Sequence, residues 1–295
     1  MNNRILIIGA SGFLGQSLVE ELLNRGISDF GVVFSNEYSY AANLQLVQQN
    51  EINYHLLNLL TDEVSHIENV FSGYDIIFNL SGQITNPITT CFQLNSIGVK
   101  KLVDAVKKLN KKLIQVSTVG VYGTVPFADE NSPVCAETTY GICKAFAEYT
   151  IKDHLDDQNY CITRLCNLYG KNQKKGIFNY LIQSYRSDRK LFFNNNGELL
   201  RYYIEVSDCA VNLINLAQSG ASGIYNLLSP EQYTVKDLIQ KFEDFLGIKY
   251  EQFLDPIKPY DNVSKISGEK ISQKIALVYN YSITKYLEDK VHNRI

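Results

Sequence analysis

The sequence predicts an α/β fold, a Rossmann-like doubly wound parallel sheet with a smaller, mixed C-terminal domain. An apolar run at Ile5–Ile8 leads into a glycine-rich turn and then into leucines at helical spacing. Strand-sized and helix-sized segments then alternate as far as about residue 165, which is typical of repeated parallel βα units. After Gly170 the alternation stops, so we expect a second domain to begin there.

The period of the apolar residues predicts each element of the first part. Short apolar runs indicate strands, and apolar residues three and four apart indicate helices. The strands are expected at Arg4–Ile8, Phe30–Phe34, Ile52–Leu57, Asp75–Leu80, Lys112–Val116 and Cys161–Leu165. The helices are expected at Phe13–Asn24, Tyr40–Gln49, Phe92–Leu109 and Thr138–Leu155.

The second part is predicted to mix helices with short strands. A helix at Ile177–Tyr185 and a strand at Leu191–Phe193 precede two capped amphipathic helices. These two are expected at Ser207–Ala217 and Val235–Leu246, with Ser207 and Thr234 as N-caps and Gly220 and Gly247 just beyond the ends. We therefore divide the chain into residues 1–170, with a return of the chain around 201–228, and residues 171–295.

Composition argues against several classes of partner. The 295 residues carry a formal net charge of −3 with scattered basic residues, so no nucleic-acid partner is expected. Apolar runs are too short for a membrane span and no signal peptide precedes the first strand, so we expect a cytoplasmic protein. Six cysteines and four histidines lack metal-ligand spacing, so we expect buried free thiols and no metal site.

The first candidate motif is the glycine-rich turn after the first strand. Gly9, Gly12 and Gly15 stand where a strand ends and a helix begins, which lets the backbone approach a pyrophosphate at the helix N-terminus. An ordinary tight turn between a strand and a helix is the alternative explanation.

The second candidate motif is Tyr140 with Lys144, four residues apart on one helical face. A tyrosine that acts as acid or base near neutral pH needs a lowered pKa, and a fixed ammonium lowers it by favouring the phenolate. A surface pair on an amphipathic helix is the alternative. Thr118, at the end of the fifth strand and 22 residues before Tyr140, supplies a hydroxyl to the same crevice.

With these motifs the chain resembles the extended short-chain dehydrogenase/reductase family, which comprises nucleotide-sugar epimerases, dehydratases and ketoreductases. The resemblance also rests on Asn79–Gly82, on Asn95 followed by Gly98, and on Arg164–Gly170. Later segments agree in the same order, namely Arg201–Ile204, Val206–Ala210 and Gly223–Asn226.

The resemblance implies a role for each candidate residue. Tyr140 would be the acid or base, Lys144 would lower its pKa, Thr118 would orient the reacting oxygen, and Asn95 would help hold the helix geometry around them. The implied cofactor-binding residues are Gly9, Ser11, Gly12, Phe13, Leu14, Gly15, Ser35, Asn36, Asn58, Leu59, Leu80, Ser81, Gly82, Tyr140 and Lys144. The implied residues for a nucleotide-linked sugar are Gln83, Thr118, Asn167, Phe178 and Arg201.

The cofactor is expected to be NADP or NAD. The second strand ends in Phe34-Ser35-Asn36, without the acidic residue that commonly bonds the adenosine ribose. A 2′-phosphate meets no repulsion there but also finds no arginine, so NADP is favoured only slightly. Asn58 replaces a common aspartate, and its amide oxygen can still accept a bond from adenine.

The reaction remains open between several alternatives. Val119 and Gly120 stand where sugar 4,6-dehydratases carry two carboxylates, so dehydration is not expected. Reduction of a 4-keto sugar is ranked first, epimerisation with retained NAD second, and a non-catalytic dinucleotide sensor third. The resemblance also implies a homodimer in which helices Phe92–Leu109 and Thr138–Leu155 pair with those of a second copy.

Overall fold

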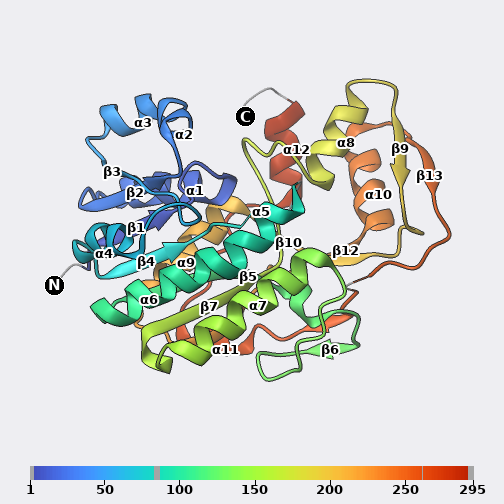
Figure 1. The fold of residues 1–295 in the computed structure, drawn as a ribbon. Coiled ribbons are helices and arrows are strands. Elements are labelled where there is room, and N and C mark those ends of the chain that lie inside the picture. The colour runs from blue at the N-terminus through green and yellow to red at the C-terminus, as the bar shows by residue number, and fades with distance from the viewer. Residues whose placement is uncertain (1–2, 83–86, 261, 292–295) are drawn as a thin grey trace.

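A computed structural model describes residues 3–82, 87–260 and 262–291 and confirms the predicted fold class (Figure 1). The central sheet has seven strands in the order β11-β7-β5-β4-β1-β2-β3, and every pair in it is parallel. The order reverses beside β1, which is the doubly wound arrangement. The strands are β1 (Ile5–Ile8), β2 (Phe30–Phe34), β3 (Asn53–Leu56), β4 (Ile76–Asn79), β5 (Lys112–Thr118), β7 (Tyr160–Leu165) and β11 (Gly223–Leu227).

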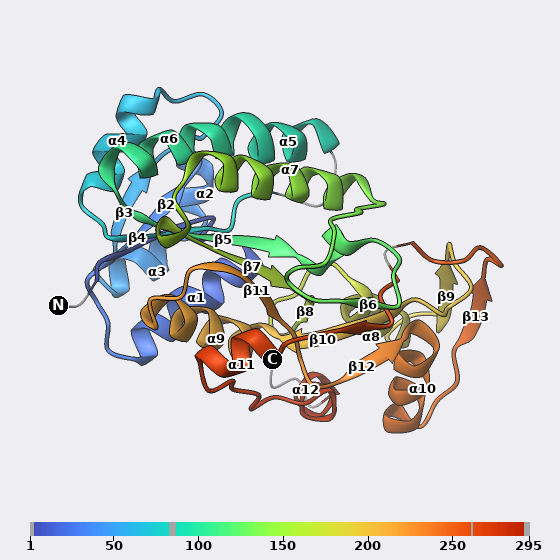
Figure 2. The ribbon, with the colours of Figure 1, turned by 90° about the horizontal axis from the view of Figure 1, so that it is seen from below.

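Helices cover both faces of this sheet, because its strands are apolar on both sides (Figure 2). One face carries α1 (Phe13–Asn24) and α9 (Val206–Gln218), which pack against each other. The other carries α4 (Val64–Ser72), α6 (Val99–Leu109) and α7 (Thr139–His154). Two separate hydrophobic cores result, one on each side of the sheet.

Two predicted helices differ from expectation. The segment at 40–49 forms two short helices, α2 (Glu37–Ala41) and α3 (Leu44–Gln49), because Asn36 caps the first one earlier than the apolar pattern suggests. The segment at 92–109 is continuous but contains a π turn, Leu94–Gly98, between α5 (Ile88–Gln93) and α6. A π turn inside an α-helix frequently marks a functional site.

The part of the chain after β7 builds a third, aromatic core. Its rings include Tyr169, Phe178, Tyr203, Phe242 and Tyr286. The elements here are β8 (Asn167–Tyr169), α8 (Ile177–Tyr185), β9 (Lys190–Phe193), β10 (Leu200–Glu205), β12 (Gln232–Thr234), α10 (Val235–Leu246), β13 (Glu251–Leu254) and α12 (Ile283–Val291). Shorter elements are β6 (Phe127–Ala128), β14 (Lys265–Ile266), α11 (Glu269–Lys274) and the 3₁₀ turns Val119–Tyr122 and Asp157–Asn159.

One of the two predicted N-caps is wrong. Thr234 caps α10 through a capping box with Asp237, as predicted. Helix α9 instead begins one residue before Ser207, and the carboxylate of Glu205 accepts from the backbone N–H groups of Ser207 and Asp208. The charge of a carboxylate suits the positive end of a helix, so glutamate replaces the usual short cap here.

The other expectations from composition have mixed outcomes. The six cysteines are free, but only five are buried, since Cys135 is exposed. Among the described residues no group of His, Cys, Asp or Glu could hold a metal ion. None of the helices within residues 3–82, 87–260 and 262–291 is long and apolar enough to cross a membrane.

Candidate active site

The turn between β1 and α1 is shaped for close approach of a ligand. Gly9 has a φ of +89°, which glycine adopts without strain. A Cβ on Gly15 would lie 2.2 Å from the Gly9 carbonyl oxygen, so the helix packs directly on the turn. Gly12 begins α1 without a side-chain cap, and its first turn holds no acidic residue.

This turn therefore leaves backbone N–H groups at the positive end of α1 open to an anion. Ser11 and Gly12 are exposed, Phe13 is half-buried and Leu14 is buried in the core. These features fit the pyrophosphate of a dinucleotide.

The segments that follow β2 and β3 carry no lysine or arginine that could pair with a 2′-phosphate. Ser35 and Asn36 are exposed after β2, but the Asn36 side chain already accepts from Ser39 N at 2.8 Å. The chain has no lysine or arginine between Arg25 and Lys100. The small preference for NADP expected from the sequence therefore finds no support in the structure.

Two predicted cofactor contacts, Asn58 and Leu59, follow β3. The first already has a hydrogen-bond partner, and the second is buried. The Asn58 amide oxygen accepts from Leu60 N at 3.0 Å and keeps one lone pair for a ligand. Leu59 is 3% exposed and belongs to the core.

Lys144 occupies the centre of the site. Its side chain is 2% exposed, and its ammonium donates to the carbonyl oxygens of Ser81 at 3.1 Å and Val116 at 3.3 Å. These carbonyls lie beyond β4 and near the end of β5, so the ammonium bridges two neighbouring strands. It also lies 5.9 Å from the centre of the Tyr140 ring, within range of a cation–π contact.

The pKa of Tyr140 is shifted in the direction opposite to the one expected from the sequence. Burial raises the pKa of Tyr140 well above its ordinary value, and the neighbouring Cys91 and Cys143 raise it further. Burial lowers the pKa of Lys144 to about 8, although Cys91 and Glu148 oppose this shift. The ammonium does not bring the tyrosine pKa below its ordinary value here, because the cost of removing a phenolate from water is larger than its effect. Tyr140 thus holds its proton in this structure.

Thr118 ends β5 at the edge of the sheet where Lys144 is anchored. Its hydroxyl accepts from Gly120 N at 3.1 Å and caps the 3₁₀ turn that follows. Gly141 packs closely on this turn, since a Cβ there would lie 2.9 Å from the Gly120 carbonyl oxygen. The first turn of α7, which contains Tyr140, is therefore seated against the segment that follows Thr118.

Asn95 joins the same cluster from the π turn. It is 1% exposed, and its amide nitrogen donates to the Cys91 carbonyl oxygen at 2.8 Å. Its amide oxygen is buried and finds no partner among the described residues. A Cβ on Gly82 would lie 2.9 Å from both the Asn95 amide nitrogen and the Lys144 ammonium. The glycine thus leaves space between these two polar groups.

The residues expected to bind the substrate differ in their access to a ligand. Asn167 is exposed on β8, and Arg201 lies on the adjacent β10, where it donates to the carbonyl oxygens of Leu200 and Tyr260. Phe178 is 1% exposed and stacks on Tyr169 at 4.4 Å, so its ring belongs to the aromatic core and has no free face for a ligand.

The remaining predicted ligand contacts are in the segment that follows β4. Leu80, Ser81 and Gly82 are half-buried at the end of β4, where Leu80 N donates to the Ile8 carbonyl oxygen. Gln83 lies outside the described residues.

Sequence reasoning missed three buried residues behind the site, namely Ser117, Glu148 and Arg164. They form one hydrogen-bonded cluster. The spacing of Glu148, four residues after Lys144 on the same helix, was the one available signal.

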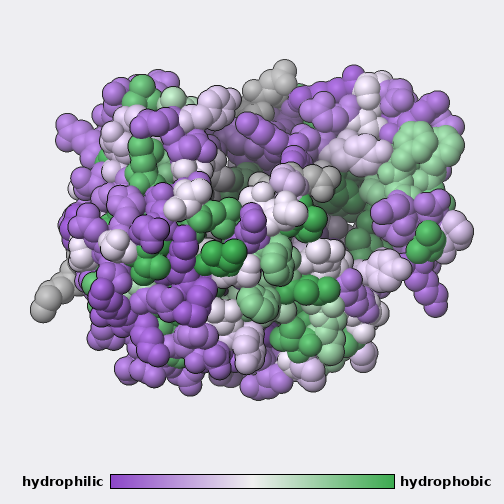
Figure 3. Space-filling view, in the orientation of Figure 1, coloured by the Kyte–Doolittle hydropathy of each residue, from purple (hydrophilic) through white to green (hydrophobic). Residues whose placement is uncertain are grey.

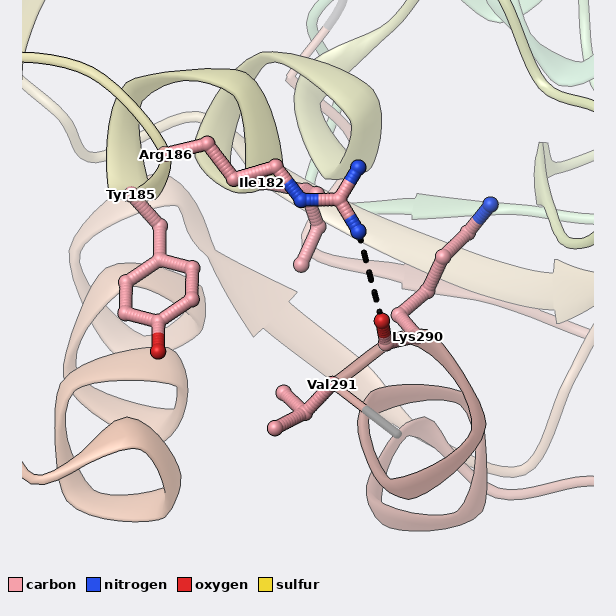
Figure 4. A pocket seen from close by; sticks show the side chains of 5 residues that line it. All are labelled: Ile182, Tyr185, Arg186, Lys290 and Val291. Carbon is pink, nitrogen blue, oxygen red and sulfur yellow. Dashed lines mark hydrogen bonds between the residues drawn. The ribbon is translucent and has the colours of Figure 1, made fainter. Parts of the chain in front are cut away.

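A separate hollow lies between α8 and α12 (Figure 4). Ile182, Tyr185, Arg186, Lys290 and Val291 line it, and the Arg186 guanidinium donates to the Lys290 carbonyl oxygen at 3.3 Å. None of the candidate catalytic residues borders it, and we assign it no role in catalysis.

The family is decided by comparison with known proteins. Residues 5–228 match the family described as NAD dependent epimerase/dehydratase. The chain belongs to this family. The match covers the glycine turn, the β5 end and the Tyr140–Lys144 pair together.

Curated relatives of this epimerase/dehydratase family member are distant. The chain is 23% identical over 273 residues to UDP-glucuronic acid decarboxylase 1 of Danio rerio, covering 85% of this chain but 63% of that protein. It is 22% identical to the dTDP-6-deoxy-L-talose 4-dehydrogenase (NAD(+)) of Aggregatibacter actinomycetemcomitans, covering 88% and 97%. An Escherichia coli O157:H7 N-acetyl-alpha-D-glucosaminyl-diphospho-ditrans,octacis-undecaprenol 4-epimerase is 22% identical, covering 99% and 90%.

Solved structures agree with the fold over nearly the full length. A UDP-glucuronic acid 4-epimerase from Bacillus cereus, in complex with UDP-glucuronic acid and NAD, superposes with a TM-score of 0.84 at 19% identity, covering 99% and 100% of the two chains. A dTDP-glucose 4,6-dehydratase from Streptomyces venezuelae gives 0.84 at 20% identity, covering 99% and 98%. At these identities the likeness establishes the fold alone.

Proposed function

We propose that this chain is an NAD-dependent enzyme that epimerises a hydroxyl-bearing carbon of a nucleotide-linked sugar through a transient ketone. The observation that carries the proposal is the position of Lys144, held between the ends of β4 and β5 and facing the Tyr140 ring. The glycine turn at α1 supports a dinucleotide, and the lack of any lysine or arginine between Arg25 and Lys100 in the sequence supports NAD over NADP.

The chain's own residues perform the proton transfer. In the oxidation step Tyr140, after releasing its own proton to solvent, accepts the proton of the sugar hydroxyl, and in the reduction step it returns a proton to the ketone oxygen. Thr118 donates a hydrogen bond that orients that oxygen. The Lys144 ammonium stabilises the phenolate that forms when the proton leaves. The glycine turn at the start of α1 would hold NAD, which would supply the hydride acceptor for the oxidation and the hydride donor for the reduction. Neither Val119 nor Gly120 can act as an acid or base, which disfavours elimination of water.

Two residues at the β8–β10 edge suit the diphosphate of such a substrate. Arg201 supplies a planar fork that bonds phosphate oxygens and stays charged. Asn167 is exposed on the neighbouring strand, with Tyr203 of β10 as its register partner. We assign these two side chains to the diphosphate and Thr118 to the sugar.

The first test is cofactor content followed by turnover. Purified protein is denatured and the released dinucleotide is identified by chromatography, and a panel of UDP- and dTDP-sugars is then followed by NMR without added cofactor. Retained NAD with conversion of a sugar to its epimer is the expected result. Tyr140→Phe should retain NAD and lose conversion by about 10³-fold or more, because only the transferable proton is removed. Full turnover by this variant would overturn the proposal.

A second candidate is NADH-dependent reduction of a 4-keto sugar. The specific observation is the 4-dehydrogenase relative, which matches over 97% of its own length. Protein that is purified empty and oxidises added NADH only with a keto sugar would favour this reaction. Absence of hydride transfer across the whole panel would favour a non-catalytic dinucleotide sensor instead.

We further propose a homodimer formed through α5 and α7. Large apolar side chains on these helices and the adjoining π turn are exposed in the described part of the chain. Figure 3 shows hydrophobic surface, with polar surface between, on the face where Figure 1 places α5 and α7. Such a patch of exposed apolar side chains is typical of an interface. The exposed residues are Ile88 (40%), Phe92 (57%), Ile97 (51%), Ile142 (55%), Phe146 (48%) and Tyr149 (65%).

A further inference from the structure

A buried ion pair lies directly behind the candidate catalytic residues. Glu148 is 3% exposed and follows Lys144 by one turn of α7, and Arg164 is 2% exposed on β7. The Arg164 Nη2 donates to Glu148 Oε2 at 2.7 Å, and its Nε donates to Glu148 Oε1 at 3.1 Å. This two-pronged contact fixes the carboxylate more tightly than a single bond would.

The same carboxylate also binds the end of β5. The Ser117 hydroxyl, 2% exposed, donates to Glu148 Oε1 at 2.5 Å. The residue before it, Val116, accepts from Lys144, and the residue after it is Thr118. Val116 and Ser117 of β5 are thus both hydrogen-bonded to side chains of α7, and Thr118 is the next residue of the strand.

The network continues to the far side of Thr118. The Arg164 guanidinium lies 4.7 Å from the centre of the Tyr122 ring, in the 3₁₀ turn that follows Thr118. The Tyr122 hydroxyl donates to Asn226 Oδ1 on β11 at 2.7 Å. The segment around Thr118 is therefore held on one side through Ser117 and on the other through Tyr122.

We propose that Glu148 is a positioning residue, which with Arg164 holds Thr118 and Lys144 in the geometry that Tyr140 needs for proton transfer. The inference rests on the proposed function for the reaction concerned. Stability alone gives no reason for the pair, because apolar residues of similar volume generally replace a buried ion pair without loss of stability. A network that spans β5, α7, β7 and β11 can instead fix one arrangement of those elements.

An electrostatic effect on Lys144 is the rival explanation, and the groups around the ammonium allow the two to be separated. Tyr140, Cys143 and Glu148 face it from α7, Cys91 from α5, and the neutral amide of Asn95 from the π turn. Glu148→Gln leaves the Arg164 guanidinium as an uncompensated positive charge. The double variant Glu148→Gln/Arg164→Met leaves no buried charge without its partner, and it also removes the Glu148 carboxylate that favours the charged form of Lys144.

The experiment compares three variants with the wild type in the proposed epimerisation, across pH. They are Glu148→Gln, the double variant, and the control Glu243→Gln, whose carboxylate is also 3% exposed but binds Lys249 in the second part of the chain. Positioning predicts that kcat of the double variant falls about 10- to 100-fold at every pH while KM stays at the wild-type value. The control should keep its kcat.

Two results would overturn the inference. One is a folded double variant with wild-type kcat, and the other is a double variant whose lost activity returns at shifted pH. If the wild type turns over no sugar, the proposed function fails while positioning is still tested by amide hydrogen exchange of residues 116–122. Exchange there should be at least about tenfold faster in the double variant than in the control, and equal exchange would refute the inference.

Discussion

Replacing Lys144 with methionine should remove a pH-dependent loss of stability and abolish proton transfer. Burial lowers the pKa of this lysine from 10.5 to about 8. A difference of about 2.5 in pKa corresponds to about 3 kcal/mol, which the folded state loses by holding a charged ammonium away from water. Methionine has no charge to bury, but it cannot donate to the Ser81 and Val116 carbonyl oxygens, so the pH dependence of stability and not its absolute value isolates the effect of the charge.

The sign follows from proton binding in the two states. Between pH 8 and pH 10.5 the unfolded chain keeps the proton on Lys144 while the folded protein releases it. The wild type therefore gains stability from this group as the pH rises through that window. Burial of Lys144 lowers the free energy of unfolding of the wild type by about 3 kcal/mol at pH 7 but by only about 1.5 kcal/mol at pH 9.5.

Urea unfolding at pH 7 and pH 9.5 measures this difference, followed by circular dichroism because the chain has no tryptophan. The advantage of Lys144→Met over the wild type should shrink by about 2 kcal/mol between the two pH values. Packing differences cancel in that comparison. Lys152→Met, on the exposed side of the same helix, is the control and should show little change. A Lys144→Met advantage that is independent of pH would refute the reasoning.

Three further predictions concern the cofactor turn, a helix cap and the exposed apolar face. Gly15→Ala should weaken NADH binding about tenfold or more in a fluorescence titration, because its Cβ would lie 2.2 Å from the Gly9 carbonyl oxygen; unchanged affinity would contradict the packing of α1. Thr234→Ala should lower the free energy of unfolding by about 1 kcal/mol through loss of the α10 cap, and an unchanged urea midpoint would argue against that cap. Phe146→Asp should convert a dimer into a monomer in light scattering, whereas a monomeric wild type would remove the proposed interface.

The sequence predicted the sheet well because each strand carries its own local signal. The runs at Ile5–Ile8 and Phe30–Phe34 are apolar on both faces, as strands buried between two helical layers must be. Glycine, proline or polar residues lie between the apolar segments and mark where each strand ends. The positions of Tyr140 and Thr118 at one edge of the sheet followed from the same reasoning, since the carboxyl ends of parallel strands share an edge.

Features that depend on contacts distant in sequence could not be predicted. The expected role of Phe178 placed it against substrate, whereas rings from four other segments enclose it. The pKa of Tyr140 was expected to fall because of Lys144, but burial, which no spacing reveals, decides its direction. The Arg164–Glu148 pair joins residues on a helix and a strand, and nothing in the local pattern distinguishes Arg164 from a surface arginine.

The path of the chain after Gly170 has a consequence for how the protein can be divided. Having left the sheet, the chain returns through α9, which packs on α1, and through β11, which pairs with β7. A fragment that ended at Gly170 would leave the open edge of β7 and the apolar side of α1 facing water. The unpaired backbone N–H and C=O groups of an open strand edge can pair with another chain, so this fragment should aggregate. The seven-stranded sheet is therefore completed by residues that lie far beyond β7 in sequence, so its edge at β7 stays uncovered until α9 and β11 have been synthesised.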